Sequence, residues 1–407
     1  MTSAQARHVS RVANETFGHS RRLLPEQPWW HNLDPSFHKF PDDFYLDLKT
    51  QAMVGATAAI DVGLRTAAAG LALTMGLPTL PLMLKKDFEQ WGYYKALANA
   101  RDAAAVFPRP RQAIEMRRHK PPALEYRPPE GTVEVLSFES RFQAMNPAMR
   151  EHYARFRRNR IAWAEHWRHD GAPRPTICLI HGYVADPYCV NSRFLALPWF
   201  YKMGYNVLLY TLPFHGRRKE WFAPVSGHGV FSYGISHINE TIAHAVHDFR
   251  LFLDYLEAQG VPQFGVTGIS LGGYTTSLLA AVEDRLAFAV PNVPVASLID
   301  LVLEWFPAAP VLKAALRFSG SSIQEARHAN AVCNPLTYAP LLPRERLMIV
   351  GGAGDRFAPP KHTRLIWDHW NHPRLHWFPG NHLIHLDQGR YLREMARFLR
   401  GIGFDRG

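Results

Sequence analysis

Residues 264–273 read FGVTGISLGG, and this stretch decides the fold class of the chain. A short apolar run opens it, as expected for a strand that is buried on both faces, and a helical pattern follows it. Ser270 stands where the strand would give way to the helix, with Gly268 and Gly272 two positions away on either side. Small residues are needed there, because a serine held in a sharp strand-to-helix turn has strained backbone angles and close neighbours. The pattern predicts a nucleophilic serine at the end of a central strand.

Three further loops each follow a short apolar run, as they would at the ends of parallel strands. They are His181-Gly182-Tyr183, the glycine-rich loop that ends at Asp355, and the loop that contains His382. Ser270, Asp355 and His382 follow one another in the chain order that a Ser–Asp–His triad has on a sheet of this kind. We expect His382 to take the serine proton and Asp355 to fix its tautomer and stabilise the imidazolium. Asp300 and His385 are the alternative acid and base.

Backbone N–H groups near the serine are the expected partners of the charge that develops on a reacting carbonyl oxygen. We assign this role to the N–H groups of Tyr183 and Leu271. Gly182 lets the chain pass closely beside the serine, and the positive end of the following helix lies beneath the developing charge. The side chain of His181 is expected to brace this loop rather than to react.

Apolar runs alternate with helical patterns from residue 131 onward, which predicts an α/β domain at 131–407 with a mostly parallel sheet and helices on both faces. Strands are expected at 133–142, 160–169, 176–180, 205–212, 264–267, 286–290, 347–350 and 375–378. Residues 291–345 interrupt the alternation with helical and aromatic segments, so we expect them to form a cap over the strand ends. Residues 1–130 read instead as a helical N-terminal extension that ends in a proline-rich linker.

These motifs resemble those of the α/β-hydrolase superfamily over residues 175–399. The loop at 212–217, LPFHGR, is similar to the PGHG-like turn that this superfamily carries after its next strand. More narrowly, residues 268–279, GISLGGYTTSLL, resemble poorly characterised bacterial hydrolases. These are similar to the group called α/β-hydrolase domain-containing protein 18, whose eukaryotic members are linked to mitochondrial phospholipid deacylation. The resemblance implies a serine hydrolase with an α/β-hydrolase fold, and it does not extend to the first 130 residues.

The reaction expected of these residues is hydrolysis of a carboxylic ester through an acyl-enzyme intermediate, with no metal or organic cofactor. Four cap residues are expected to line an apolar acyl pocket, unless they serve only in cap packing: Leu298, Leu301, Trp305 and Phe306. A serine peptidase of the proline-iminopeptidase type shares the same fold and triad. A scaffold that binds a lipid or a partner without catalysis is the competing class. A haloalkane dehalogenase is excluded, because it needs Asp where Ser270 stands.

The chain carries a formal net charge of +11, which suits either a solvated basic face or peripheral contact with an anionic membrane. No nucleic-acid-binding motif accompanies this charge, so we expect no nucleic-acid partner. The substrate is expected to be a small-molecule or lipid ester. The Trp29–Trp30 pair and an apolar run at 66–84 favour a lipid, although glycines and prolines in the run favour a packed or surface-lying helix over a membrane span.

The compartment is inferred from the cysteines and from the N-terminus. The three cysteines show no metal-ligand spacing and suit a reducing compartment. The first thirty residues show no signal-peptide pattern. We therefore expect a cytoplasmic protein, with membrane association as the alternative.

Overall fold

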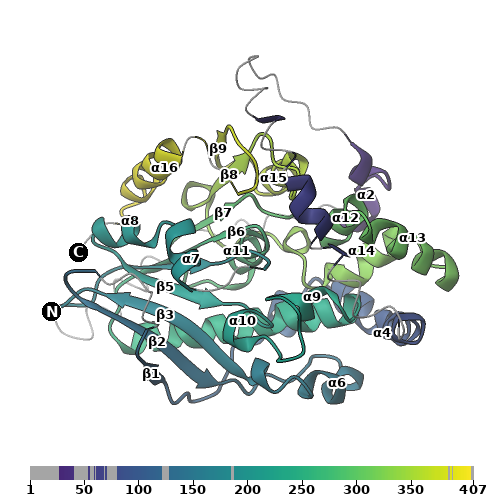
Figure 1. The fold of residues 1–407 in the computed structure, drawn as a ribbon, viewed down its shortest axis with the longest axis horizontal. Helices are drawn as coiled ribbons and strands as arrows, with labels where there is room; N and C mark the ends of the chain where they lie inside the picture. The colour runs from purple at the N-terminus through teal and green to yellow at the C-terminus, as the bar shows by residue number, and fades with distance from the viewer. Residues whose placement is uncertain are drawn as a thin grey trace.

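The computed structural model describes residues 27–40, 54–55, 59, 61–67, 69–70, 80–121, 128–184, 188–383, 386 and 388–404. A sheet of nine strands runs through the centre of this part of the chain (Figure 1). The strands are β1 (Arg117–His119), β2 (Thr132–Glu139), β3 (Ile161–Arg168), β4 (Thr176–Ile180), β5 (Asn206–Thr211), β6 (Phe264–Ile269), β7 (Ala289–Asn292), β8 (Met348–Gly352) and β9 (Arg374–Phe378). Their order across the sheet is β1-β2-β3-β5-β4-β6-β7-β8-β9.

Helices cover both faces of this sheet. The helices whose bounds fall within the described residues, including those that pack away from the sheet, are α2 (Trp29–Asn32), α4 (Leu80–Ala100), α5 (Ala103–Val106), α6 (Arg150–Ala154), α7 (Tyr188–Phe194), α8 (Leu197–Lys202), α9 (His228–Phe231), α10 (Ile235–Ala258), α11 (Leu271–Val282), α12 (Leu298–Glu304), α13 (Ala308–Ser319), α14 (Ile323–Ala331), α15 (Pro360–His369) and α16 (Gln388–Gly401). The apolar side chains of α10 and α11 lie on one face, and those of α8 and α16 lie on the other.

The strands from β5 to β9 in the sheet order form a parallel block, and β1, β2 and β3 extend it as antiparallel strands. β2 and β3 pair over their whole length, from Thr132 opposite Arg168 to Glu139 opposite Ile161. β1 lies in the region expected from sequence to be linker, so the sheet begins upstream of the expected boundary at residue 131. Its three residues are polar and mostly exposed, which left no apolar pattern to indicate a strand.

Side chains of the central strands alternate between two apolar cores, one on each face of the sheet. In β4, Cys178 and Ile180 belong to the core shared with α10 and α11. Ile177 and Leu179 belong to the core shared with α8 and α16. Because successive side chains of a strand point to opposite faces, a strand that is apolar throughout must be covered on both.

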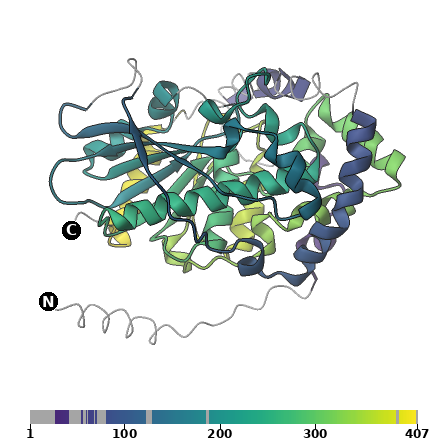
Figure 2. The same ribbon diagram turned by 90° about the horizontal axis from the view of Figure 1, so that it is seen from below.

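The cap between β7 and β8 consists of α12, α13 and α14, and α4 packs beside it (Figure 2). Trp91 of α4 shares an apolar cluster with cap residues that include Ile299 and Leu316. Tyr94, on the same helix, is fully buried in the main core and donates its hydroxyl to Glu240 of α10 at 2.6 Å. One face of the described N-terminal helix α4 is therefore packed against the body of the molecule.

The Trp29–Trp30 pair also packs inside. Trp30 is fully buried, and its ring stacks on His328 of α14 with 4.9 Å between the ring centroids. Nε1 of Trp29 donates to the hydroxyl of Thr337 at 3.0 Å. Trp30 is thus unavailable to a lipid surface, contrary to the interpretation of this pair from sequence. Most of the apolar run at 66–84 lies outside the described residues, and none of the described helices has the length and hydropathy needed to cross a membrane.

Candidate active site

Ser270 occupies a strained turn between β6 and α11. Its backbone has φ 59° and ψ −115°, a conformation that non-glycine residues rarely adopt and that costs free energy unless the surroundings enforce it. Two glycines make the turn sterically feasible. A Cβ on Gly268 would lie 2.4 Å from the carbonyl oxygen of Gly272, and a Cβ on Gly272 would lie 2.2 Å from the carbonyl oxygen of Ile180. The backbone N–H of Ser270 donates to the carbonyl of Asn292 at 3.0 Å, which ties the turn to β7.

Asp355 and His382 form a buried hydrogen-bonded pair. Nδ1 of His382 donates to Oδ2 of Asp355 at 2.6 Å. Oδ1 of Asp355 accepts from the backbone N–H groups of Phe357 and Ala358, each at 2.8 Å, so both carboxylate oxygens have partners. Burial alone would lower the pKa of His382, but the carboxylates of Asp355 and Asp61 outweigh it and raise this pKa above its ordinary value.

The serine and this pair lie at the same edge of the sheet. Ser270 follows β6, Asp355 follows β8 and His382 follows β9, and all three strands belong to the parallel block. Because parallel strands end at a common edge, the three loops face the same side of the sheet. The acid and base loops are joined directly, since the N–H of Gly354 donates to the carbonyl of Gly380 at 2.9 Å.

The loop after β4 passes close to the serine. A Cβ on Gly182 would lie 3.3 Å from Cβ of Ser270, so a larger residue there would press on the nucleophile. Neither the N–H of Tyr183 nor that of Leu271 has an acceptor among the described residues. Leu271 opens the twelve-residue helix α11, whose first N–H groups carry partial positive charge. Both N–H groups therefore stay candidates for the oxyanion contact expected from the sequence.

His181 braces this loop. Its Nε2 accepts the backbone N–H of Leu212 at 3.1 Å, and its Nδ1 donates to the carbonyl of Gly182 at 2.8 Å. Burial lowers the pKa of His181 to about 4, so the ring is neutral at physiological pH, as an acceptor nitrogen requires. The bond to Leu212 ties the loop after β4 to the loop after β5.

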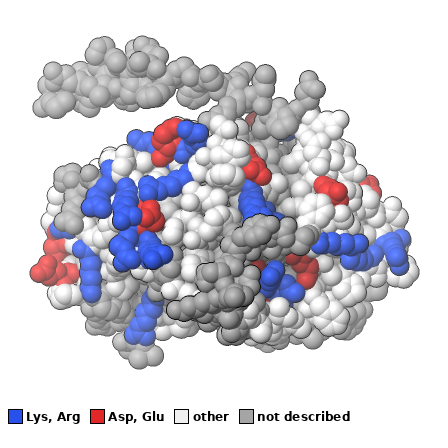
Figure 3. Space-filling model, turned by 90° about the horizontal axis from the view of Figure 1, so that it is seen from above, with Lys and Arg blue, Asp and Glu red and all other residues white. Residues whose placement is uncertain are grey.

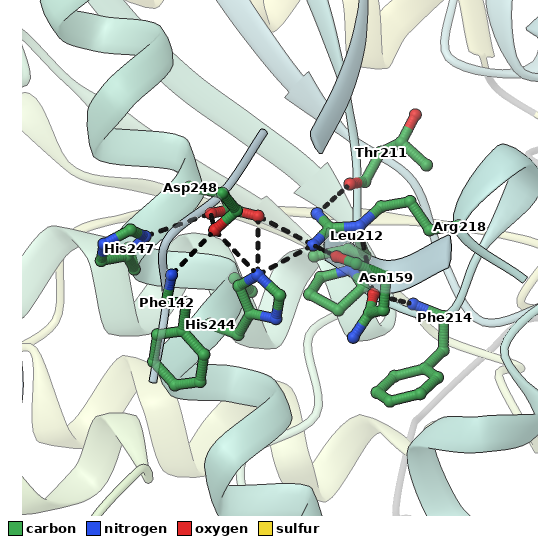
Figure 4. Close-up of polar contacts among 12 residues, drawn as sticks. Phe142, Asn159, Thr211, Leu212, Phe214, Arg218, His244, His247 and Asp248 are labelled. Carbon is green, nitrogen blue, oxygen red and sulfur yellow. Dashed lines mark hydrogen bonds and ion pairs between the residues drawn. The ribbon is translucent and has the colours of Figure 1, made fainter. Parts of the chain in front are cut away.

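A buried ion pair holds the loop after β5, which carries the LPFHGR turn (Figure 4). Arg218 and Asp248 are both fully buried, with Nη2 of Arg218 2.7 Å from Oδ2 of Asp248. The same guanidinium donates to the carbonyl oxygens of Asn159 and Thr211. Nε2 of His244 lies 3.0 Å from Asp248, and burial lowers the pKa of this histidine to about 4.

This cluster was not identified from the sequence, although a signal was present. Glu240, His244 and Asp248 recur every four residues along α10, on a helix whose side chains are mostly buried. Polar residues repeating at helical spacing within an apolar helix indicate a buried polar network.

The expected acyl-pocket residues are divided by the structure. Leu298, Leu301 and Trp305 line an apolar cavity of about 150 Å³ that lies between α4 and the cap. Phe306 does not line it and is 67% exposed, because α12 ends at Glu304 and the chain turns outward before α13. The structure thus places Phe306 outside this cavity, apart from the other three residues.

Two residues that line the cavity connect it to the candidate site. Tyr183, from the loop beside the serine, is one of its lining residues. Trp305 contacts the ring of Phe357 at 4.5 Å between centroids, and Phe357 stacks on the imidazole of His382 at 4.8 Å. Tyr183 thus links the cavity to the loop beside Ser270, whereas the rings of Trp305 and Phe357 separate it from the imidazole of His382.

The alternative acid lies elsewhere, in the cap. Asp300 lies in α12 and forms a fully buried pair with Arg327, at 2.6 Å, so its carboxylate is already engaged in the cap. His385 lies outside the described residues. Within the described part of the chain, no three His, Cys, Asp or Glu side chains are grouped so that they could hold a metal ion.

A second carboxylate, which no pattern in the sequence indicated, lies against the acid–base pair. Asp61 is fully buried, and its Oδ2 accepts the backbone N–H groups of Arg356 at 3.0 Å and His382 at 2.9 Å. Burial, followed by the charge of Asp355, raises the pKa of Asp61.

The chain is similar to known proteins over the span that contains these loops. A family model described as Serine hydrolase (FSH1) matches residues 216–387, a span that includes Ser270, Asp355 and His382. The uncharacterised proteins MT2702 and Rv2627c of Mycobacterium tuberculosis are each 32% identical to the chain over 220 residues, covering 52% of this chain and 50% of each relative. The chain thus spans about half the length of the curated relatives it matches.

Two solved structures share most of the architecture. They are the acetyl xylan esterase 1 of Thermoanaerobacterium sp. JW/SL YS485 and the acetyl xylan esterase of Paenibacillus sp. R4. Each gives a TM-score of 0.53 at 14% identity over 76% of this chain, covering 94% and 92% of the respective esterase chains. The protein has the α/β-hydrolase fold, as the sequence predicts.

Proposed function

We propose that the protein is a serine hydrolase that cleaves carboxylic esters through an acyl-enzyme intermediate. The observation that carries this proposal is the strained Ser270 at the same sheet edge as the buried Asp355–His382 pair. A structural serine has no need of such a turn, whereas a nucleophile gains exposure of its oxygen and free backbone N–H groups beside it. The match to a serine hydrolase family model over these loops supports the same reaction.

The steps follow from the roles of the three side chains. The Ser270 hydroxyl proton passes to Nε2 of His382 while Oγ attacks the ester carbonyl carbon, and the N–H groups of Tyr183 and Leu271 hold the oxyanion. The C–O bond to the alcohol then breaks, and the alcohol leaves with the proton from the imidazolium. Water repeats the sequence, with His382 as its base, and releases the carboxylic acid.

The cavity supports a substrate with an apolar acyl group of modest size. A cavity of about 150 Å³ is known to hold a molecule as large as benzene, so this one suits an acyl chain of about six carbons. The resemblance of residues 268–279 to the α/β-hydrolase domain-containing protein 18 group favours a lipid ester instead. A panel of nitrophenyl esters from acetate to laurate, with phospholipids beside it, separates these two substrates.

Labelling with a fluorophosphonate probe tests the reaction itself. Wild-type protein should label and Ser270→Ala should not. A folded wild type that stays unlabelled and inactive on the whole ester panel would support the non-catalytic scaffold. Cleavage of prolyl arylamides in preference to esters would identify the peptidase alternative.

The same proposal includes peripheral contact with an anionic membrane surface. Four exposed arginines of α16 support it: Arg390, Arg393, Arg397 and Arg400. Figure 3 shows Lys and Arg gathered at the end of the molecule where α16 lies. Vesicles with anionic lipid should carry the protein in flotation, neutral vesicles should not, and binding should weaken as salt screens the charges. Equal flotation with both vesicle types would contradict the electrostatic contact.

A further inference from the structure

We infer that Asp61 is a positioning residue of the catalytic site. Through Asp61, the N-terminal segment, defined as the described residues of 54–70, holds the loops of Asp355 and His382 in register. This inference rests on the proposed hydrolase function and adds a residue to it. The three side chains of the proposed triad all come from the C-terminal two-thirds of the chain. Asp61 lies far upstream, yet it contacts the loops of both Asp355 and His382.

Two hydrogen bonds carry the inference. One carboxylate oxygen of Asp61 accepts the N–H of Arg356, the residue after Asp355, and also the N–H of His382 itself. The two donors belong to loops that follow different strands, β8 and β9. A single oxygen therefore fixes the spacing between the backbones of the acid and the base. A shift of either loop would stretch one of these bonds.

Other residues of the same segment contact the acid loop. Arg65 lies one helical turn after Asp61 and donates from Nη1 to the carbonyl of Arg356 at 2.7 Å. Val54 fills the space beside Gly354, where a Cβ would come within 2.2 Å of its Cγ1. The segment thus meets the acid loop at Gly354 and Arg356, and Asp61 also reaches the base loop.

The burial of Asp61 argues that the contact is more than packing. Its side chain is fully buried, and Oδ1 has no hydrogen-bond partner among the described residues. A buried carboxylate with one unsatisfied oxygen costs free energy, so packing alone gives no reason to place one here. Its charge does have a use, because the imidazole of His382 becomes positively charged when it takes the serine proton. The charges of two carboxylates, Asp355 on the β8 loop and Asp61 on the N-terminal segment, both raise the pKa of that imidazole.

Glu240 offers a matched control elsewhere in the molecule. It is also a fully buried carboxylate, and it accepts the backbone N–H groups of Met145 at 2.6 Å and Asn146 at 3.0 Å. It lies on α10, and neither of these bonds reaches the loops of the proposed triad. A Glu240→Gln variant therefore reports what the loss of a buried charge does when the charge is not beside the base.

The experiment compares the full-length wild type with Asp61→Ala, Asp61→Asn and Glu240→Gln. Each protein is checked for folding by circular dichroism, and the rate of fluorophosphonate labelling is measured from pH 5 to pH 9. Asp61→Ala removes both bonds and the charge, and should slow labelling at neutral pH on the order of tenfold, the loss expected for about 1.4 kcal/mol of positioning. Asp61→Asn keeps an acceptor oxygen but removes the charge. The acid limb of its labelling rate against pH should move to lower pH, because the imidazolium loses one of the two carboxylate charges that stabilise it.

The outcomes distinguish the positioning role from the function on which it rests. If wild type does not label at all, the proposed function fails. If wild type labels, and both Asp61 variants are folded and label at the wild-type rate with an unchanged acid limb, the positioning role of Asp61 is overturned. It is overturned as well if Glu240→Gln shifts the limb as much as Asp61→Asn does. A shift of the acid limb in the Asp61 variants, with none in Glu240→Gln, supports the positioning role of Asp61.

Discussion

Asp355 accepts the Nδ1–H of His382 at 2.6 Å through one carboxylate oxygen, while two backbone N–H groups hold the other oxygen. The carboxylate is therefore fixed in place before any substrate arrives. It also selects the imidazole tautomer that leaves Nε2 unprotonated and able to accept a proton. This arrangement makes the acid the most direct point at which to test the site.

Asp355→Asn should preserve the fold but lower the rate of ester hydrolysis by about 10³- to 10⁴-fold, because an amide favours the wrong imidazole tautomer. Initial rates on a nitrophenyl ester measure this loss. Asp300→Asn is the comparison, since it breaks a buried pair with Arg327 in the cap and should reduce stability. A larger loss of turnover in folded Asp300→Asn than in Asp355→Asn would reverse the assignment of the acid.

The pH dependence of turnover follows from the direction of the shift at His382. The proposed base must be neutral to take the serine proton, and its pKa is raised above the ordinary histidine value of 6.5. Activity should therefore rise with pH through a limb centred above 6.5 and fall away below it. A profile of kcat/KM against pH measures the limb, since it reports on the free enzyme. A limb centred below 6.5 would contradict the charge environment described here.

Strands buried on both faces were the elements most readily predicted from sequence. The apolar run at 176–180 coincides with β4, and every side chain of this strand is buried. Burial on both faces is what gives such a strand its continuous apolar pattern. The strand expected at 286–290 is observed instead as Ala289–Asn292. Leu286 is buried beside the sheet without belonging to it, and the strand itself contains Pro291 and Asn292, which strands usually disfavour. The apolar pattern thus indicated which residues are buried, but it placed the hydrogen-bonded strand too early in the chain.

The site was predictable where it follows strand ends, and hidden where it depends on contacts between distant segments. Ser270 and the loops of Asp355 and His382 each follow an apolar run, which is a local signal. Asp61 and His382 are separated by 321 residues, and nothing around Asp61 marks it as a partner. Such pairings are set by how the helices dock, and one sequence read alone contains no trace of them.

Asp248→Asn should destabilise the protein by about 3–5 kcal/mol, because it leaves the guanidinium of Arg218 buried without its countercharge. Urea unfolding measures the change. Glu151→Gln is the control, since it removes an exposed pair with Arg155 and should cost at most about 1 kcal/mol. An equal loss of unfolding free energy in Asp248→Asn and Glu151→Gln would contradict the prediction that the buried ion pair matters more than the exposed one.

The same carboxylate should contribute to acid stability. Burial alone would raise the pKa of Asp248, but His244 and Arg218 lower it well below its ordinary value. A carboxyl whose pKa is lower in the folded state stabilises the protein above its unfolded pKa of about 3.9, and this contribution is lost as pH falls further. Stability curves below pH 5 should thus be flatter for Asp248→Asn than for wild type. Parallel curves would contradict this prediction.

Gly272→Ala should abolish fluorophosphonate labelling or prevent folding. The added methyl group would lie 2.2 Å from the carbonyl oxygen of Ile180, which is backbone and cannot rotate away. Gly92→Ala is the control, because its added Cβ meets nothing within 4 Å, and alanine favours the helix by up to about 1 kcal/mol. Folded Gly272→Ala protein that labels like wild type would show that the turn can open without loss.

Chain-length preference tests whether the apolar cavity receives the acyl group. Leu301→Phe adds volume inside a cavity of about 150 Å³, so the ratio of kcat/KM for hexanoate over acetate esters should fall about tenfold or more. The acetate ester needs little of the cavity, and its kcat/KM should change much less. Phe306→Ala provides the comparison, since this side chain is 67% exposed and lies outside the cavity, so the ratio should stay at the wild-type value. If Leu301→Phe leaves the hexanoate-to-acetate ratio unchanged while Phe306→Ala alters it, the acyl chain binds outside this cavity. A cavity filled by the larger Phe side chain could not accept a long acyl chain as readily as the open wild-type cavity.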